Sequence, residues 1–313
     1  MSAAWLLRRL GAILLVLLIV SFTVFGITQL LPGNAAVMIL GEFATAASRE
    51  AMELALGLND PWWEQYLRWL GGILRGDWGM SVGLSRPVVS LVGDALGRSA
   101  LLAATTLCVV CVIAVPVGVA GALLRGSVFD AVIGLFAYVG ASVPEFVTAT
   151  LLLVLVAGDW LPAGGFTPLA ENPLDFVLHM ILPVATLSLI LIAHLSRQLR
   201  SEMAEVLGSD YIRAARVKGL SAPRIVLVHA LRNALAPAVA VLSLDVGYLL
   251  GGILVVEEVF AWPGLGRLLI YSVQNRDLPL MQAATLVMAA AYTLSNLAAD
   301  IVIAWLDPRV RYA

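Results

Sequence analysis

The sequence is poor in charge. Asp, Glu, Lys and Arg make up 13% of its 313 residues, whereas about a quarter is usual in a soluble domain. Hydrophobic residues make up 61%, and the mean hydropathy is +0.95. These values exclude ordinary soluble domains, although the length would allow two of them. They predict an all-α membrane protein whose chain crosses the bilayer several times.

Residue types that carry chemistry are also scarce. Lys218 is the single lysine of the chain and stands in V-K-G, so the G-x-x-x-x-G-K-[ST] loop that cradles nucleotide phosphates is excluded. Three histidines are scattered without metal-ligand spacing, and the pair Cys108 and Cys111 is a weak metal signal. No convergent catalytic set is apparent either. We therefore expect the chain to bind no metal or cofactor and to be no enzyme by itself.

Long apolar runs are what the sequence has instead. A membrane span needs about 20 mostly apolar residues, which rise 1.5 Å each in a helix. The first run is too long for the apolar part of a signal peptide, so we interpret it as a span. Six transmembrane helices in a single domain of residues 1–313 are expected, at about 10–31, 99–124, 131–157, 177–195, 235–256 and 280–306.

Basic residues predict the orientation, because short cytoplasmic loops are enriched in Lys and Arg. Arg8 and Arg9 precede the first span, and the segment 197–234 is strongly basic, whereas the segment 160–176 has no Lys or Arg. We therefore expect both termini and the 197–234 loop to be cytoplasmic. The long segment 32–98 is expected to be extracytoplasmic.

One acid, Asp245, lies near the middle of the fifth expected span. An acid within a span is costly, and it usually marks a transport pathway or a pairing site. The sequence offers Asp245 no obvious partner within this chain. A place in a transport path and a pairing with a neighbouring helix or subunit both stay open.

The stretch 211–237, YIRAARVKGLSAPRIVLVHALRNALAP, holds five Lys or Arg residues and no acid. Ser209 or Asp210 can cap a short helix that Gly219 ends, and Ser221 can cap a second helix that continues into the fifth span. Two interpretations stay open on physical grounds. The segment is a basic amphipathic loop on anionic lipid, or a short helix with a small-residue face that fits a groove of a soluble partner.

The expected outer segments supply two more candidates. Trp62, Tyr66 and Trp69 recur at helical spacing on one face, which indicates either an interfacial helix on the membrane or a contact for another protein. A second candidate is the turn that contains Glu257 and Trp262, which is either an external gate or a rigid elbow. Its proline and glycine content favours the elbow.

Several motifs make the chain resemble a known family. The stretch A-A-R-V-K-G-L at 214–220, followed by H-A-L-R-N-A at 229–234, resembles the EAA loop of ABC importer permeases. The closest likeness is to the B-type subunit of the dipeptide, oligopeptide and nickel permease family. Further matches follow in family order: L-L-P-G at 30–33, P-W-W-E-Q-Y-L-R-W-L-G-G-I-L-R-G-D-W-G at 61–79, S-V-P-E-F at 142–146, V-E-E-V-F-A-W-P-G-L-G-R at 256–267, R-D-L-P-L-M-Q at 276–282 and L-D-P-R-V-R-Y at 306–312.

The resemblance implies a type I ABC importer fold in a bacterial or archaeal plasma membrane. It implies a homologous permease subunit as pore partner, two cytoplasmic ATPases that hold ATP and Mg²⁺, and an extracytoplasmic solute-binding protein, with no nucleic acid. Short peptides are the expected cargo, with nickel chelates, glutathione-like molecules and opines as alternatives. A secondary transporter is the alternative of another class, but the repeat of spans typical of that class is not seen.

The resemblance also assigns residues. The residues expected to couple the chain to an ATPase are Tyr211, Arg213, Ala214, Ala215, Arg216, Lys218 and Gly219, with both alanines and the glycine at the tightest contact. Asp245, Ser142 and Glu145 are the candidates for the translocation path. Two positions depart from the family pattern, because Arg213 stands where the motif has glutamate and Asp245 where glutamine is common. An acid in the path would favour cationic or zwitterionic cargo.

Overall fold

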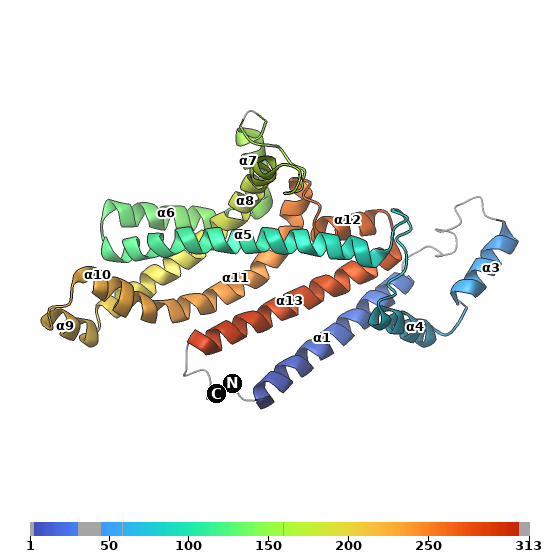
Figure 1. The fold of residues 1–313 in the computed structure, drawn as a ribbon, viewed down its shortest axis with the longest axis horizontal. Coiled ribbons are helices and arrows are strands. Elements are labelled where there is room, and N and C mark those ends of the chain that lie inside the picture. The colour runs from blue at the N-terminus through green and yellow to red at the C-terminus, as the bar shows by residue number, and fades with distance from the viewer. Residues whose placement is uncertain (1–2, 31–44, 58, 159, 307–313) are drawn as a thin grey trace. The chain divides into compact units, whose positions relative to one another are not determined.

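The structure is a computed structural model that describes residues 3–30, 45–57, 59–158 and 160–306. Within these ranges every regular element is a helix (Figure 1), which confirms the all-α expectation. Residues 31–44 of the expected outer segment and the motif after residue 306 lie outside the described residues. The helices are α1 (Ala3–Leu30), α3 (Ala46–Leu56), α4 (Trp62–Arg75), α5 (Val88–Leu123), α6 (Val128–Ser142), α7 (Glu145–Val156), α8 (Pro173–Leu207), α9 (Asp210–Val217), α10 (Ala222–Arg224), the π-helix η1 (Ile225–Ala230), α11 (Leu231–Val259), α12 (Leu265–Gln274) and α13 (Leu278–Leu306).

Five helical stretches among the described residues are long and apolar enough to cross a membrane, and the bent pair α6 and α7 makes a sixth if it is one span. This agrees with the six spans expected from the sequence. The third span differs from a single helix, because its two halves are bent by 105°. Pro144 explains the break, since Val143 before it takes an extended conformation, φ −92° and ψ 122°, as residues before proline usually do.

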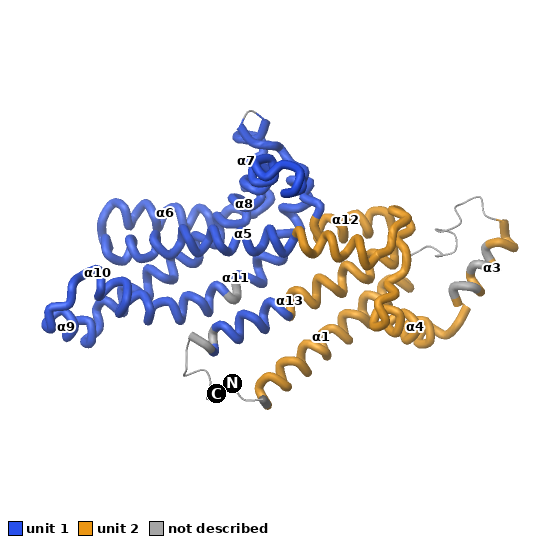
Figure 2. Tube along the Cα trace, viewed as in Figure 1, with its two compact units in different colours: residues 1–2, 99–263, 294–313 blue, residues 3–98, 264–293 orange. Residues whose placement is uncertain are grey.

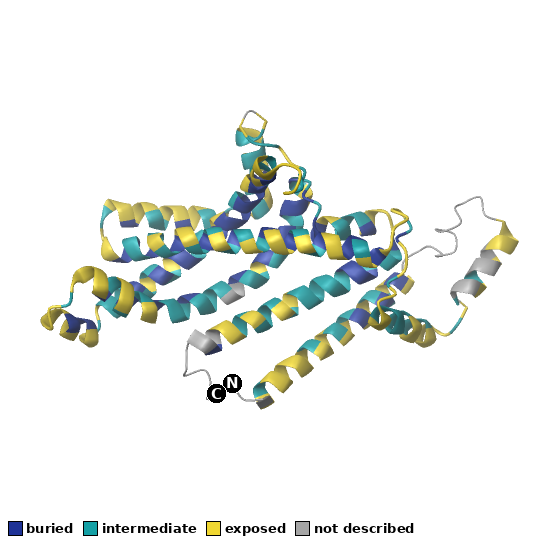
Figure 3. Cartoon of the chain, in the orientation of Figure 1, coloured by how far each residue is buried: buried dark blue, intermediate teal, exposed yellow. Residues whose placement is uncertain are grey.

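The chain forms two compact units, coloured separately in Figure 2. Unit 1 holds residues 99–263 and the chain from 294 onward, and unit 2 holds residues 3–98 and 264–293. Exposed apolar side chains are plentiful on α1 and α6 (Figure 3), including Leu14, Leu15 and Phe136. A surface this apolar fits helices whose outer faces meet lipid or other membrane helices.

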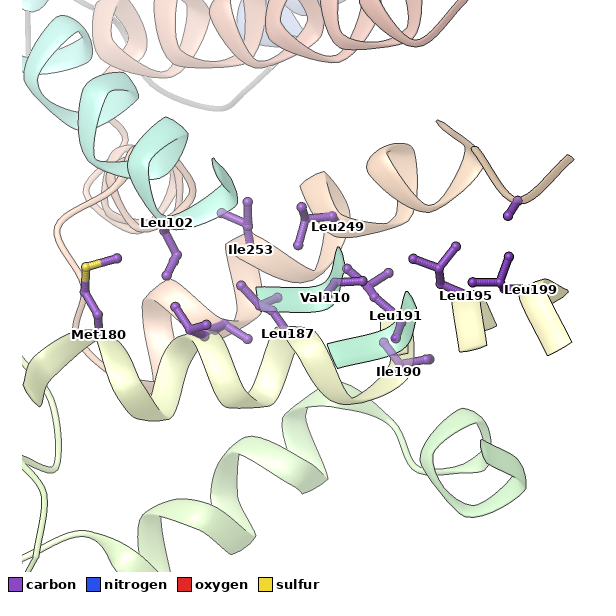
Figure 4. Close-up of a cluster of buried hydrophobic side chains, with 14 of the residues drawn as sticks. Leu102, Val110, Met180, Leu187, Ile190, Leu191, Leu195, Leu199, Leu249 and Ile253 are labelled. Carbon is purple, nitrogen blue, oxygen red and sulfur yellow. The ribbon is translucent and has the colours of Figure 1, made fainter. Parts of the chain in front are cut away.

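The core of unit 1 is apolar and lies between α5, α8 and α11 (Figure 4). Leu102 and Val110 of α5, Leu191 of α8 and Leu249 of α11 are among its fully buried members. Gly118 of α5 lets this helix approach α8 closely, because a Cβ there would lie 2.9 Å from the Ser196 carbonyl oxygen. Small residues at such crossings are typical of packed membrane helices.

Unit 2 has its own small core, formed by α5, α12 and α13 around Val88, Leu265 and Leu280. Asp277, which is fully buried, anchors the loop before α5 to the start of α13. Its carboxylate accepts hydrogen bonds from the Ser81 hydroxyl and from the Gly83 backbone N–H, the latter at 3.1 Å. Because these donors satisfy the buried charge, the loop is held in one conformation.

Candidate functional site

Helix α9 lies in the loop that the sequence predicts to couple the chain to a partner. Ser209 takes the extended N-cap conformation and Gly219 ends the turn at φ +77°, so both expected boundaries are confirmed. The Ser209 hydroxyl does not cap α9, however, because it donates to the Val206 carbonyl oxygen at 2.6 Å. Arg213, which replaces the motif glutamate, forms an ion pair with Asp210 one turn earlier.

The two faces of α9 differ in burial. Ile212 and Ala215 are buried in the core of unit 1, at 0% and 8% exposure. Ala215 was expected at the tightest contact with a partner protein, and this expectation needs correction because its side chain packs within the chain. The exposed face carries Ala214, Val217 and Lys218, and Val217 is 89% exposed. We call the exposed residues Tyr211, Arg213, Ala214, Arg216, Val217, Lys218 and Gly219 the outer face of α9.

A polar link connects α9 to the helix that follows it. The Asn233 side-chain amide donates to the Tyr211 hydroxyl at 2.8 Å and to the His229 carbonyl oxygen at 3.0 Å. His229 belongs to the π-helix η1, a type of turn that often occurs at functional sites. The helices α10, η1 and α11 run without interruption from Ala222 to Val259, so the Asn233–Tyr211 hydrogen bond ties α9 to this continuous helical stretch.

A second polar contact in unit 1 joins α6 to α8. We call it the Asp130–Arg200 clamp. The Arg200 guanidinium of α8 forms two hydrogen bonds with the Asp130 carboxylate of α6, one through Nη2 at 2.6 Å. The Gly126 backbone N–H donates to the same carboxylate at 3.0 Å. A bidentate pair with a third donor is a strong and geometrically specific contact.

Asp245 has a partner that the sequence did not reveal. His194 of α8 lies with its Nδ1 3.1 Å from Asp245 Oδ1, which corrects the expectation that no partner exists within the chain. Asp245 is 5% exposed, and its Oδ2 has no hydrogen-bond partner among the described residues. One oxygen of this carboxylate is therefore satisfied and the other is not.

Glu145 is the first residue of α7, directly after the break in the third span. Its carboxylate lies against Gly252 of α11, so closely that a Cβ at position 252 would collide with it. Ser142, at the end of α6, is exposed and donates its hydroxyl proton to the Tyr138 carbonyl oxygen at 2.7 Å. Asp245 and Gly252 are seven residues apart and share a face of α11 with Tyr248. We call Glu145, Asp245, Tyr248 and Gly252 the acid face.

The aromatic residues of α4 pack within unit 2. Tyr66 lies edge-on to Phe22 and Phe25 of α1, with centroid distances of 5.7 and 5.5 Å. Trp62 lies edge-on to Phe22 at 5.6 Å, and the Trp69 ring is tilted by 35° against Phe25 at 5.7 Å. The expected shared helix face is therefore real, but it covers α1. Trp62 stays 51% exposed, so a contact of this face with another protein stays a prediction.

Glu257 and Trp262 are both fully buried in unit 1. The Ser99 hydroxyl donates to Glu257, and the Trp262 ring packs edge-on against Phe166 at a centroid distance of 5.0 Å. Because both side chains are buried, neither offers a surface to a second protein, and a role as an external gate stays a prediction. The rigid elbow is the interpretation that the packing favours.

Sequence reasoning missed Val217, His194 and Gly252. The signal for Val217 was available, because it lies three residues after Ala214 and therefore on the same helix face. His194 and Gly252 gave no such signal, since their importance depends on contacts with residues far along the chain. Among the described residues, no three His, Cys, Asp or Glu side chains lie together as metal ligands.

Two family models match most of the chain. The model of the binding-protein-dependent transport system inner membrane component matches residues 114–312, and a model of the N-terminal part of such membrane components matches residues 2–91. A relative from Brucella melitensis, named as a peptide transport system permease protein, is 38% identical over the whole of both chains.

Two further relatives cover nearly all of the chain. The dipeptide transport system permease protein of Escherichia coli K12 is 36% identical, over 98% of each chain. A protein of Sinorhizobium fredii, named as a peptide ABC transporter permease, is 36% identical over 98% of this chain and 99% of its own. These matches confirm the resemblance to importer permeases. The chain belongs to the family of inner membrane components of binding-protein-dependent transport systems, and it is a multi-pass permease of the plasma membrane.

Proposed function

We propose that the chain forms half of the pore of an ATP-driven importer of short peptides. The observation that carries this proposal is the full-length similarity, at 36 to 38% identity, to permeases that are named for peptide or dipeptide transport. A homologous permease subunit would form the other half. A solute-binding protein would deliver the peptide to segment 32–98 and the other outer loops, and both termini would lie in the cytoplasm.

The outer face of α9 would dock into a groove of a cytoplasmic ATPase. Val217 supports this proposal, because an aliphatic side chain that is 89% exposed gains about 1.5–3 kcal/mol when it is fully buried. Ala214 beside it allows close approach of the partner backbone. Arg213, Arg216 and Lys218 would set the orientation through acidic residues at the rim of the groove.

Docking would couple ATP to transport through the connection between α9 and α11. ATP and Mg²⁺ on the partner ATPases would close those subunits and move α9. The Tyr211–Asn233 hydrogen bond and the buried Ile212 would carry this movement into η1 and α11. ATP and the loaded binding protein would each favour the outward-open state, since a ligand shifts an equilibrium only by its differential affinity.

The translocation path would follow the acid face and the break at Ser142. An interrupted helix in the bilayer is tolerated where it is buried in protein or lines a water-filled cavity. Glu145 is half-buried at this break, and intramembrane acids usually face the bundle interior or an aqueous path. Asp245, whose carboxylate contacts His194, would come after Glu145 along this path.

Purification of the tagged chain from its native membrane would test the proposal. We expect a sister permease and two ATPase subunits to co-purify. We also expect the complex in proteoliposomes to take up labelled di- or tripeptides only with ATP and the binding protein. A chain that purifies alone and accumulates solute from an ion gradient would contradict the importer and would favour a secondary transporter.

A further inference from the structure

The break in the third span interrupts the main-chain hydrogen bonds of a helix expected to cross the membrane. Helix α6 ends at Ser142 and α7 begins at Glu145, and the last carbonyl groups of a helix have no partner within it. The Val143 N–H donates to the Val139 carbonyl oxygen at 3.2 Å. This bond pairs the first of the last four carbonyl groups of α6. Carbonyl oxygens near position 142 therefore face a place where lipid cannot satisfy them.

The charges at the break all have one sign. The end of α6 carries the negative end of the helix dipole, and the Glu145 carboxylate follows three residues later. Gly252 admits this carboxylate to the surface of α11, because any larger residue would displace it. Helix ends and unwound carbonyls of this kind hold cations in other membrane transport proteins.

Asp245 provides a second, independent observation on the same helix face. It precedes Gly252 by seven residues, which is about 10 Å along α11. Its Oδ2 is buried and has no hydrogen-bond partner among the described residues, although buried polar atoms are normally paired. Tyr248 lies between Asp245 and Gly252 on this face of α11. Asp245, with its unsatisfied oxygen, therefore lies on the same side of α11 as Gly252, which the Glu145 carboxylate contacts.

We propose that the acid face binds the primary ammonium group of the cargo, first at Glu145 and the α6 carbonyl end and then at Asp245. This inference rests on the proposed function and names the chemical group that the path recognises. An ammonium group has three N–H donors, which match the carboxylate and carbonyl acceptors at the break. In a peptide, this group is the free α-amine or a lysine side chain.

Glu145→Gln in the complete transport complex tests the proposal, because it removes the charge and keeps the size. We expect the maximal rate of peptide uptake to fall about tenfold, the effect of losing one hydrogen bond to a charged group. The KM should stay unchanged, since the binding protein sets it, and so should ATP hydrolysis stimulated by the binding protein. The matched control is Glu171→Gln, an exposed acid outside the spans.

Gly252→Ala provides a second variant that keeps the acid but displaces it. A Cβ at position 252 collides with the Glu145 carboxylate, whereas a Cβ at Gly251 meets nothing within 4 Å. We therefore expect slower uptake for Gly252→Ala and normal uptake for Gly251→Ala. Normal uptake by Glu145→Gln, or a parallel loss of uptake and stimulated ATP hydrolysis, would overturn the proposal. Failure of the unmodified complex to transport any peptide would instead refute the proposed function.

Discussion

Two regions of unit 1 differ in how completely their polar groups are hydrogen-bonded. At the α8–α9 end, the Asp130 carboxylate receives two bonds from Arg200 and one from Gly126, and the Tyr211 hydroxyl accepts a bond from Asn233. At the acid face, one oxygen of Asp245 finds no hydrogen-bond partner in the part of the chain that the structure describes. A fully satisfied network makes a structure rigid, whereas an incomplete one is costly to keep. The first region therefore has the rigidity needed to transmit movement. The second has, among the described residues, an unpaired acceptor that could bind cargo transiently.

Of the variants that test this comparison, the one that breaks the Asp130–Arg200 clamp should have the largest effect, a loss of assembled complex. Asp130→Asn would leave Arg200 without its charged partner, and removal of one member of such a pair is usually destabilising. We expect several-fold less assembled complex in the membrane, because modest losses of stability change abundance to that extent. The measurement is quantitative blotting of purified membranes.

The control for the clamp is Glu205→Gln, which alters an exposed acid near the end of α8. Its abundance should match the unmodified chain. Normal abundance and normal thermal stability of Asp130→Asn would contradict this comparison, because the clamp would then stabilise the complex no more than the acid face does.

Neutralising the acid face should leave assembly intact and change transport instead. Asp245→Asn keeps the shape and removes a partly satisfied buried charge, so we expect unchanged abundance and unchanged thermal stability of the complex. Uptake of peptides with a free α-amine should fall about 5-fold more than uptake of the same peptides with an acetylated α-amine and no lysine, within the range of a lost charge-assisted bond. Competition between labelled peptides in proteoliposomes measures this ratio, and an equal effect on both peptides would count against the cationic preference.

The smallest effect should come from the link between α9 and α11. Tyr211→Phe keeps the ring and removes two exposed hydrogen bonds of the hydroxyl, the one from Asn233 and a longer one to the His229 carbonyl oxygen, of which a well-formed bond contributes about 0.5–1.5 kcal/mol. We expect about 2-fold fewer peptides transported per ATP hydrolysed, with normal abundance. Asn233→Ala should give the same ratio, and the double variant should be no worse than either single variant. An unchanged ratio in both variants would show that the link does not transmit movement.

Much of the fold was accessible from the sequence because it depends on local properties. Apolar run length predicts the spans, and the φ preference of glycine explains why Gly219 ends the α9 turn. Pro144 explains the break in the third span, although a proline within a span does not by itself show whether the helix kinks or breaks. These features follow from chain geometry within a few residues.

The candidate site was less accessible, because it depends on contacts between distant residues. His194 and Asp245 are 51 positions apart, and no pattern in either segment indicates that they meet. The helical spacing of Trp62, Tyr66 and Trp69 predicted a shared face but could not identify α1 as its partner. Likewise, an eight-residue helix with several small residues does not reveal that Ala215 faces inward and Ala214 outward.

The most direct test of the account is whether the outer face of α9 couples the chain to its ATPase. In the reconstituted complex, Val217→Asp places a charge at the centre of this face, and Ser201→Asp places the same charge on an exposed position of α8. The account predicts that Val217→Asp loses binding-protein-stimulated ATP hydrolysis and peptide uptake together, while Ser201→Asp retains both. Full stimulation and uptake in the Val217→Asp complex would contradict it.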